Sequence, residues 1–140
     1  MTDASEPAAH ARTRQDHAAE IAEDYVEAIA DTIEAHGTCR VTDLADRFGV
    51  THVTVIRTLQ RLERDGLVRT EPYKPVGLTA SGHTLAAACR RRHEIVERFL
   101  LSIGVPPDIA AVDAEGIEHH VSDATLERFR RITEEKRTGG

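Results

Sequence analysis

The stretch DAEGIEHHVS, residues 113–122, concentrates acidic and imidazole side chains within an otherwise ordinary sequence. If this stretch is helical, Glu115, Glu118 and His119 stand at positions i, i+3 and i+4, which places their side chains on one face. Crowded carboxylates repel one another when ionised, and their burial costs desolvation energy. Because a divalent cation removes both penalties, this spacing predicts a metal site. His120 points about 100° away around the helix and is expected to be structural.

Residues elsewhere in the chain could complete such a site. Asp24 and Glu27 lie three positions apart in a helix that is expected from about Asp16 to Gly37. His93 falls in a long helix that is expected over residues 80–102. Taken alone, the two carboxylates are more simply explained as a solvated acidic face, and His93 as a packed or capping histidine. Their interpretation therefore depends on the order of the surrounding elements.

Residues 41–66 have the pattern of a helix-turn-helix. A short helix with an apolar stripe ends at Gly49, and Thr51 is a good N-cap for a second amphipathic helix that ends at Asp65-Gly66. The alternative is an ordinary helical hairpin with basic residues facing solvent. The side chains of this segment that are predicted to reach base edges and phosphates are Thr51, His52, Thr54, Arg57, Gln60 and Arg61.

A β-hairpin is expected directly after the second helix. Leu67–Thr70 and Val76–Thr79 read as two short strands around a Pro-Tyr-Lys-Pro tip, and Lys74 at this tip could contact the DNA backbone. Such a hairpin is the wing of a winged helix. Thr79 or Ser81 is expected to cap the long helix that follows.

The remaining sequence predicts two more helices. Pro106-Pro107 opens the helix that carries residues 113–122, and a last amphipathic helix is expected from about Asp123 to Glu135. The predicted fold is mainly α: an N-terminal winged helix-turn-helix with a small β-hairpin wing, followed by an all-helical metal-binding and dimerisation domain. The expected boundaries are 1–15 for a disordered tail, 16–80 for the DNA-binding domain and 81–137 for the helical domain.

Composition narrows the function classes. The net charge of −6 argues against indiscriminate binding to nucleic acid, but residues 38–80 carry more basic than acidic side chains, unlike the acidic N-terminal part. The two cysteines, Cys39 and Cys89, form no metal-binding spacing and suggest a reducing cytoplasm. No apolar run is long enough to cross a bilayer, so no membrane association is expected.

Four motifs together resemble the manganese-regulator branch of the diphtheria-toxin-repressor family across residues 17–136. They are EDYVEAI at 23–29, the winged helix at 41–79, RHEIVERFLLSIGV at 92–105 and DAEGIEHHVS at 113–122. Iron-sensing relatives continue into a C-terminal SH3-like domain, whereas this chain matches the short, two-part architecture.

The resemblance implies a binuclear manganese site, with two Mn²⁺ per subunit. The positions that match the family's ligands are Asp24, Glu27, His93, Glu115, Glu118 and His119. By the family pattern, Glu27 and Glu115 bridge the metals; His93 and Glu118 complete one of them, and Asp24 and His119 the other. Iron-selective relatives place Met at the position of Asp24 and Cys at that of Glu115. The carboxylates found here suit the harder Mn²⁺, and Glu97, one turn after His93, is a candidate supporting group.

The function that the resemblance implies is an Mn²⁺-responsive repressor of manganese uptake genes. It would act as a cytoplasmic homodimer on double-stranded, palindromic operator DNA, and it would not be an enzyme. One alternative is an iron-responsive repressor of the same family, and another is a metal-independent winged-helix regulator with a salt-bridged acidic cluster. A dinuclear metal enzyme is a third, although the chain lacks the Glu-x-x-His motifs that such enzymes usually carry.

Overall fold

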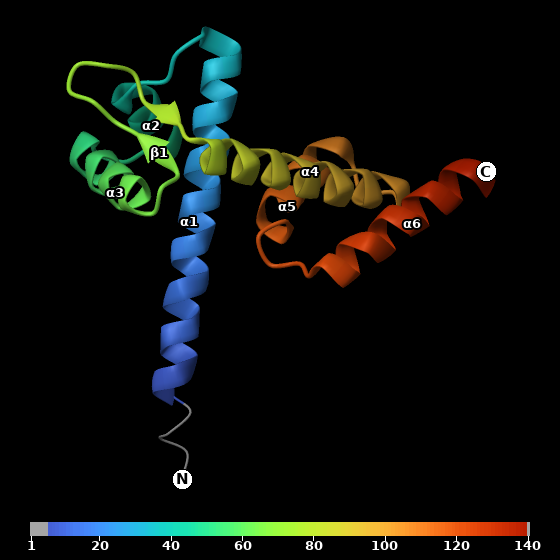
Figure 1. Ribbon diagram of the computed structural model, residues 1–140. Coiled ribbons are helices and arrows are strands. Elements are labelled where there is room, and N and C mark those ends of the chain that lie inside the picture. The colour runs from blue at the N-terminus through green and yellow to red at the C-terminus, as the bar shows by residue number, and fades with distance from the viewer. Residues whose placement is uncertain (1–5, 140) are drawn as a thin grey trace. The chain divides into compact units, whose positions relative to one another are not determined.

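The chain is mainly helical with one small antiparallel sheet, which confirms the predicted fold class (Figure 1). The computed structural model describes residues 6–139, with side chains from Arg14 onward. The contacts divide the chain between Ala86 and Ala87. The described elements are α1 (Glu6–His36), α2 (Val41–Phe48), α3 (His52–Arg64), β1 (Val68–Arg69), β2 (Gly77–Leu78), α4 (Ala80–Ser102), α5 (Pro107–Ile117) and α6 (Asp123–Gly139).

The first helix begins earlier than the sequence predicts. α1 starts at Glu6 instead of near Asp16, so the structure extends the helix through residues 6–15, which were expected to belong to a tail; residues 1–5 lie outside the described part. This segment has no apolar periodicity, but it is rich in alanine, and Pro7 falls in the first turn, where proline is tolerated. A packed helix that follows removes the nucleation cost and allows such a segment to extend it.

The helix-turn-helix forms as predicted. α2 ends at Gly49, whose φ of +64° is the left-handed conformation that glycine adopts without strain. Thr51 then caps α3, because its side chain accepts a hydrogen bond of 3.1 Å from the backbone N–H of Thr54. The apolar faces of α2 and α3 pack with α1, and the buried side chains at the centre of this core include Ile29, Leu44 and Leu62.

The hairpin is shorter than predicted but lies where the sequence places it. Its strands pair antiparallel, with Val68 opposite Leu78 and Arg69 opposite Gly77. The hydroxyl of Thr79 connects the segment before β1 to the start of α4. It donates to the carbonyl of Gly66 at 2.6 Å and accepts from the N–H of Gly82 at 3.0 Å. Thr79 is therefore the cap of α4, one of the two residues that the sequence offered for this role.

The first turns of α4 belong with the N-terminal unit. Leu85 and Ala86 pack into the core of that unit, so the division falls inside α4, beyond the boundary expected at residue 80. Gly82 allows the backbone of α4 to approach the backbone of Leu67 closely, because a Cβ at position 82 would lie 2.1 Å from the backbone oxygen of Leu67.

The C-terminal unit combines the rest of α4 with α5 and α6. Its small core contains Val96, Ala114 and Leu126, and the stacked rings of Phe99 and Phe129 lie beside them with centroids 4.1 Å apart. α6 extends to Gly139, past the expected end near Glu135, and Ser122 caps its first turn by accepting from the N–H of Thr125. Among the described residues, none of the helices combines the length and apolar character that a bilayer span requires.

Candidate functional site

Three of the predicted metal ligands lie together in the C-terminal unit. His93 projects from α4, Glu115 from α5, and Glu118 from the residue that follows α5. The Nδ1 atom of His93 is 3.7 Å from Oε1 of Glu115 and 3.9 Å from Oε1 of Glu118. One ligand atom from each residue lies within 4.8 Å of the other two. An imidazole nitrogen and two carboxylates at this spacing form a donor set that fits a hard divalent cation.

Burial distinguishes these three side chains. Glu118 is only 1% exposed, whereas the Glu115 side chain is 56% exposed. Nδ1 of His93 is buried and has no hydrogen-bond partner among the described residues. A buried carboxylate beside a buried imidazole nitrogen is costly in an apolar environment, and a cation bound between them offsets that cost.

The DAEGIEHHVS stretch is not one continuous helix, which corrects the geometry assumed from its spacing. α5 ends at Ile117, so Glu118 and His119 lie in the turn beyond it. Glu118 nevertheless keeps helical backbone angles, and its N–H donates to the carbonyl of Ala114. The helical spacing therefore still brings Glu118 close to Glu115. His119 also lies close to Glu118, with 3.8 Å between its Nε2 and the Oε1 of that carboxylate.

An arginine that the sequence analysis passed over holds this turn. Arg92 donates from Nε to the carbonyl of Glu118 at 2.9 Å and from Nη2 to the carbonyl of Val121 at 2.8 Å. The charged guanidinium thus satisfies two backbone acceptors beyond the end of α5. The sequence signals that connect it to the site are its position directly before His93 and its place at the start of the RHEIVERFLLSIGV motif.

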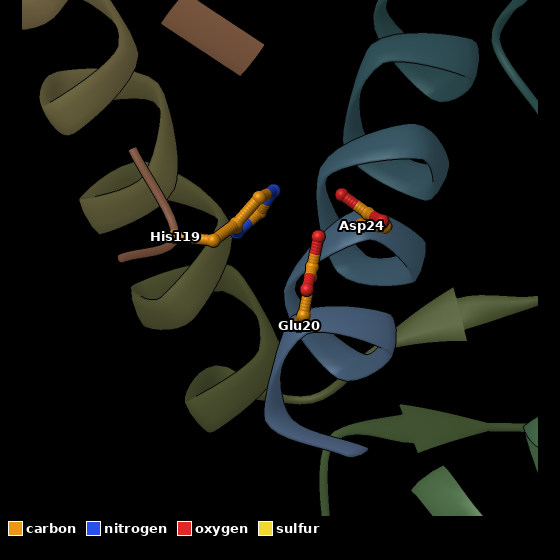
Figure 2. Close-up of side chains that lie close together, drawn as sticks. All are labelled: Glu20, Asp24 and His119. Atoms are coloured by element: carbon orange, nitrogen blue, oxygen red, sulfur yellow. The ribbon is translucent and has the colours of Figure 1, made fainter. Parts of the chain in front are cut away.

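The other two predicted ligands, Asp24 and Glu27, lie on α1 in the N-terminal unit. Both are half-buried, and each has an interaction partner, so neither belongs to a freely solvated acidic face. Glu20 lies one turn before Asp24 on the same side of α1 (Figure 2), and carboxylate oxygens of these two residues come within 4.8 Å of each other. Sequence reasoning omitted Glu20, although its i, i+4 spacing from Asp24 could have indicated it.

The sequence analysis expected His120 to be structural and named Glu97 as a candidate supporting group. His120 is exposed in the turn after α5, and its ring packs edge-on to the ring of His119 at a centroid distance of 6.4 Å. Glu97 contacts the imidazole of His93 from the following turn of α4. Among the described residues, the group that could hold a metal ion with Glu115 and Glu118 includes His93 but neither His120 nor Glu97.

The second candidate site is the surface of α3 and the hairpin. Arg61 differs from the other residues predicted to face DNA: it is half-buried, and its Nη2 atom is fully covered. Lys74 at the hairpin is exposed but forms an ion pair of 2.8 Å with Glu71. The exposed members of the predicted set are Thr51, His52, Thr54, Arg57, Gln60 and Lys74.

Three exposed side chains of this surface were not predicted. Val53 and Ile56 on α3 are 57% and 45% exposed, although apolar residues at such positions normally face a core. Tyr73 at the hairpin tip is fully exposed and has a φ of +64°, which is uncommon for a residue other than glycine. Apolar and aromatic side chains of this kind can contact thymine methyl groups and sugars. In the sequence, these positions could have been recognised because apolar residues interrupt an otherwise polar face.

The base of the hairpin is fixed to the end of α3. The carboxylate of Glu63 accepts hydrogen bonds from the hydroxyl of Thr70 at 2.7 Å and from its N–H at 3.2 Å. These two bonds to the charged form lower the pKa of Glu63. The contact sets the position of β1 relative to α3, and so that of the hairpin relative to the exposed side chains of the helix.

Two family models match the chain. The model described as iron dependent repressor, N-terminal DNA binding domain, matches residues 17–76. The model described as iron dependent repressor, metal binding and dimerisation domain, matches residues 79–138.

Relatives and solved structures agree with these matches. The transcriptional regulator MntR of Escherichia coli O157:H7 is 49% identical over 123 residues, which is 88% of this chain and 79% of that protein. The HTH-type regulator MntR of Listeria monocytogenes serovar 1/2a is 37% identical over 112 residues, covering 80% of this chain and 79% of that protein. A solved manganese-dependent transcriptional repressor in complex with manganese is 33% identical at a TM-score of 0.72, over 80% of this chain. This chain covers 52% of that structure, about half its length.

Proposed function

Because the chain belongs to the iron-dependent repressor family, whose members are DNA-binding transcriptional repressors and not enzymes, we propose that it represses transcription when it binds Mn²⁺. This membership confirms the resemblance found in the sequence and removes the dinuclear enzyme from the alternatives. The observation that carries the metal dependence is the buried Nδ1 of His93, which faces the carboxylates of Glu115 and Glu118 at 3.7 and 3.9 Å.

The proposed ligands come from both units of the chain. The C-terminal unit would supply His93, Glu115, Glu118 and His119, and α1 would supply Asp24 and Glu27, for two metal ions per subunit. When bound, the ions would neutralise the negative charge of the carboxylates. The half-burial of Asp24 and Glu27 supports their inclusion, since carboxylates on a purely solvated face are normally exposed.

Manganese is favoured over iron by the chemistry of the donors. Carboxylate oxygens predominate in the proposed set, with one imidazole for each metal, and the chain offers carboxylates at Asp24 and Glu115 where iron-selective relatives carry sulfur ligands. Oxygen ligands suit Mn²⁺, whereas thioether and thiolate ligands favour softer ions. The similarity to the solved manganese-dependent transcriptional repressor, at 33% identity, supports the same choice.

Metal binding and DNA binding would be coupled through α1. α1 carries Asp24 and Glu27 and also packs against α2 in the core of the DNA-binding unit. A ligand that binds one arrangement of this unit more tightly shifts the population toward that arrangement, and by linkage the DNA must then strengthen metal binding by the same factor. Without metal, repulsion among the carboxylates would disfavour the competent arrangement.

The proposed DNA target is a palindromic operator read by a homodimer in the cytoplasm. A two-fold symmetric dimer presents two copies of α3, and these would enter major grooves about 34 Å apart, one turn of the double helix. This surface is supported as the DNA-binding surface by the exposed polar side chains of α3, by the exposed Val53 and Ile56, and by the hairpin. The C-terminal match to a metal-binding and dimerisation domain supports the dimer.

The test is DNA binding titrated against metal. A duplex selected from a random library in the presence of Mn²⁺ would serve as the probe, and its binding would be measured anaerobically with Mn²⁺, Fe²⁺, Co²⁺ and Zn²⁺. We expect tight binding with Mn²⁺, none without metal, and loss of the response in Glu115→Ala. Asp113→Asn removes a neighbouring exposed carboxylate and should respond normally. Metal-independent binding by Glu115→Ala would support a metal-independent regulator, and a response to Fe²⁺ alone would support the iron-sensing alternative.

A further inference from the structure

The imidazole of His93 has a different environment at each of its nitrogen atoms. Nε2 lies 2.8 Å from Oε2 of Glu97, a residue one turn later on α4. Nδ1, on the other side of the ring, faces Glu115 and Glu118. The His93 side chain is 19% exposed and that of Glu97 33%, so their contact is partly shielded from water.

This arrangement determines which ring nitrogen keeps a lone pair that can coordinate a metal ion. An ionised carboxylate only accepts hydrogen bonds, so the 2.8 Å contact requires a proton on Nε2 of His93. In the neutral ring, Nδ1 then keeps its lone pair and directs it toward Glu115 and Glu118. A histidine that binds metal through one nitrogen usually donates its other N–H to a carboxylate or carbonyl, which fixes the tautomer and the ring orientation.

We propose that Glu97 is a positioning residue that holds His93 in the Nε2–H tautomer, with Nδ1 aimed at the metal-binding carboxylates. This inference rests on the proposed function, because it assigns a role to Glu97 within the proposed metal site. Glu97 acts from the opposite edge of the ring and lies outside the group formed by His93, Glu115 and Glu118. It therefore supports a ligand and is not one itself.

A simpler explanation is a helical His–Glu pair that adds only local stability. Such i, i+4 pairs are common on helix surfaces and stabilise a helix only slightly. The two explanations differ in what a glutamine at position 97 should do. Its amide oxygen can still accept from Nε2–H without the negative charge, so a positioning role is kept while an ion pair is lost.

The experiment compares Glu97→Ala, Glu97→Gln and the wild-type protein, with Mn²⁺ affinity measured by calorimetry on the full chain. Glu97→Ala should lose affinity about 10- to 100-fold, as is typical when the partner of a metal-bound histidine is removed, and Glu97→Gln should retain most of it. In the metal-free protein, the ¹⁵N signals of His93 should report the Nε2–H tautomer in wild type and Glu97→Gln, and a tautomer mixture in Glu97→Ala. Glu94→Ala, which removes an exposed carboxylate beside His93, should match wild type in both measurements.

The outcomes separate the two proposals. If Glu97→Ala keeps wild-type affinity and tautomer while His93→Ala loses Mn²⁺ binding, the role of Glu97 is refuted and the metal site stands. Equal losses in Glu97→Gln and Glu97→Ala would also refute positioning, because charge alone would then explain the effect. If His93→Ala binds Mn²⁺ as well as wild type, the proposed function itself fails.

Discussion

Arg92 and Glu118, separated by 26 positions in the sequence, are joined by a hydrogen bond of 2.9 Å from the guanidinium Nε to the backbone carbonyl. A second bond from Nη2 to the carbonyl of Val121 fixes the other end of the same turn. This turn carries Glu118 and His119, and Glu118 faces the residue next to Arg92. A single arginine on α4 therefore orders the backbone that presents two of the proposed ligands.

Replacing Arg92 should weaken both the C-terminal unit and its metal binding. Arg92→Ala leaves two carbonyls without their charged donor, and we expect the free energy of unfolding to fall by about 2 kcal/mol. Mn²⁺ affinity should fall about tenfold, since the turn that presents Glu118 becomes less ordered. Urea unfolding of the metal-free protein and calorimetric Mn²⁺ titration measure the two effects separately.

Two further variants define what this result means. Arg92→Lys keeps the charge but not the planar pair of donors that reaches two carbonyls, so it should resemble Arg92→Ala. Arg91→Ala removes the adjacent, exposed arginine and should leave both measurements unchanged. A lysine variant with wild-type metal affinity would show that positive charge near the site, and not the fixed turn, is what matters.

The sequence predicted the elements with strong local signals. The short helices α2 and α3 have clear apolar stripes, Gly49 and Thr51 mark the turn between them, and the structure confirms all of these features. The early start of α1 was missed because residues 6–15 have helix-forming residues but no apolar periodicity, a pattern also typical of a disordered tail. The end of α5 at Ile117 was also missed, although Gly116, a poor helix former, precedes it.

The structure brings together three of the predicted ligands, His93, Glu115 and Glu118, whereas the complete ligand set remains a proposal. The spacing of Glu115, Glu118 and His119 already indicated a metal site, and the family resemblance added the remaining proposed ligands. The hydrogen bonds of Arg92 could not be predicted, because they connect a helix interior to carbonyls in a turn far along the chain. No periodicity in the sequence records contacts of that kind.

Gly82 should be intolerant of a side chain. Gly82→Ala would place a Cβ 2.1 Å from the backbone oxygen of Leu67, so the start of α4 must shift away from the strand segment. We expect the N-terminal unit to lose about 1–3 kcal/mol of stability, measured by thermal or urea unfolding. Gly116→Ala is the matched control, because that helical position has open space and should gain up to about 1 kcal/mol. A neutral Gly82→Ala would mean that the two segments separate without penalty.

Cys39 should make stability depend on pH in the alkaline range. Burial, followed by the nearby charge of Asp43, raises the pKa of this thiol to about 11 from an ordinary value of 9.0. The unfolded chain then releases the proton more readily than the folded one. The contribution to stability is therefore complete below pH 9 and is lost as the pH rises toward 11, by at most about 3 kcal/mol.

The measurement is urea unfolding at several pH values for Cys39→Ala and its parent, both in a Cys89→Ala background. The parent should lose stability relative to Cys39→Ala between pH 9 and pH 11, and the two should run parallel below pH 8. In the folded parent, the buried thiol should also react slowly with a thiol reagent at neutral pH, since little thiolate is present. Parallel curves over the whole range would show that the thiol titrates alike in both states.

Arg57 and Arg61 lie one turn apart on α3 and were both predicted to face DNA, but they should behave differently. Arg57 is exposed, so Arg57→Ala should weaken binding to the selected duplex by about 1–3 kcal/mol if it contacts a base edge. If it contacts phosphate instead, the salt dependence of binding should fall by about one ion per site. Because Nη2 of Arg61 is already covered, Arg61→Ala should affect DNA binding less. It should mainly lower the unfolding free energy, through the lost packing of the half-buried aliphatic stem of the side chain. Equal losses of DNA affinity without any loss of stability would instead place both guanidinium groups at the DNA.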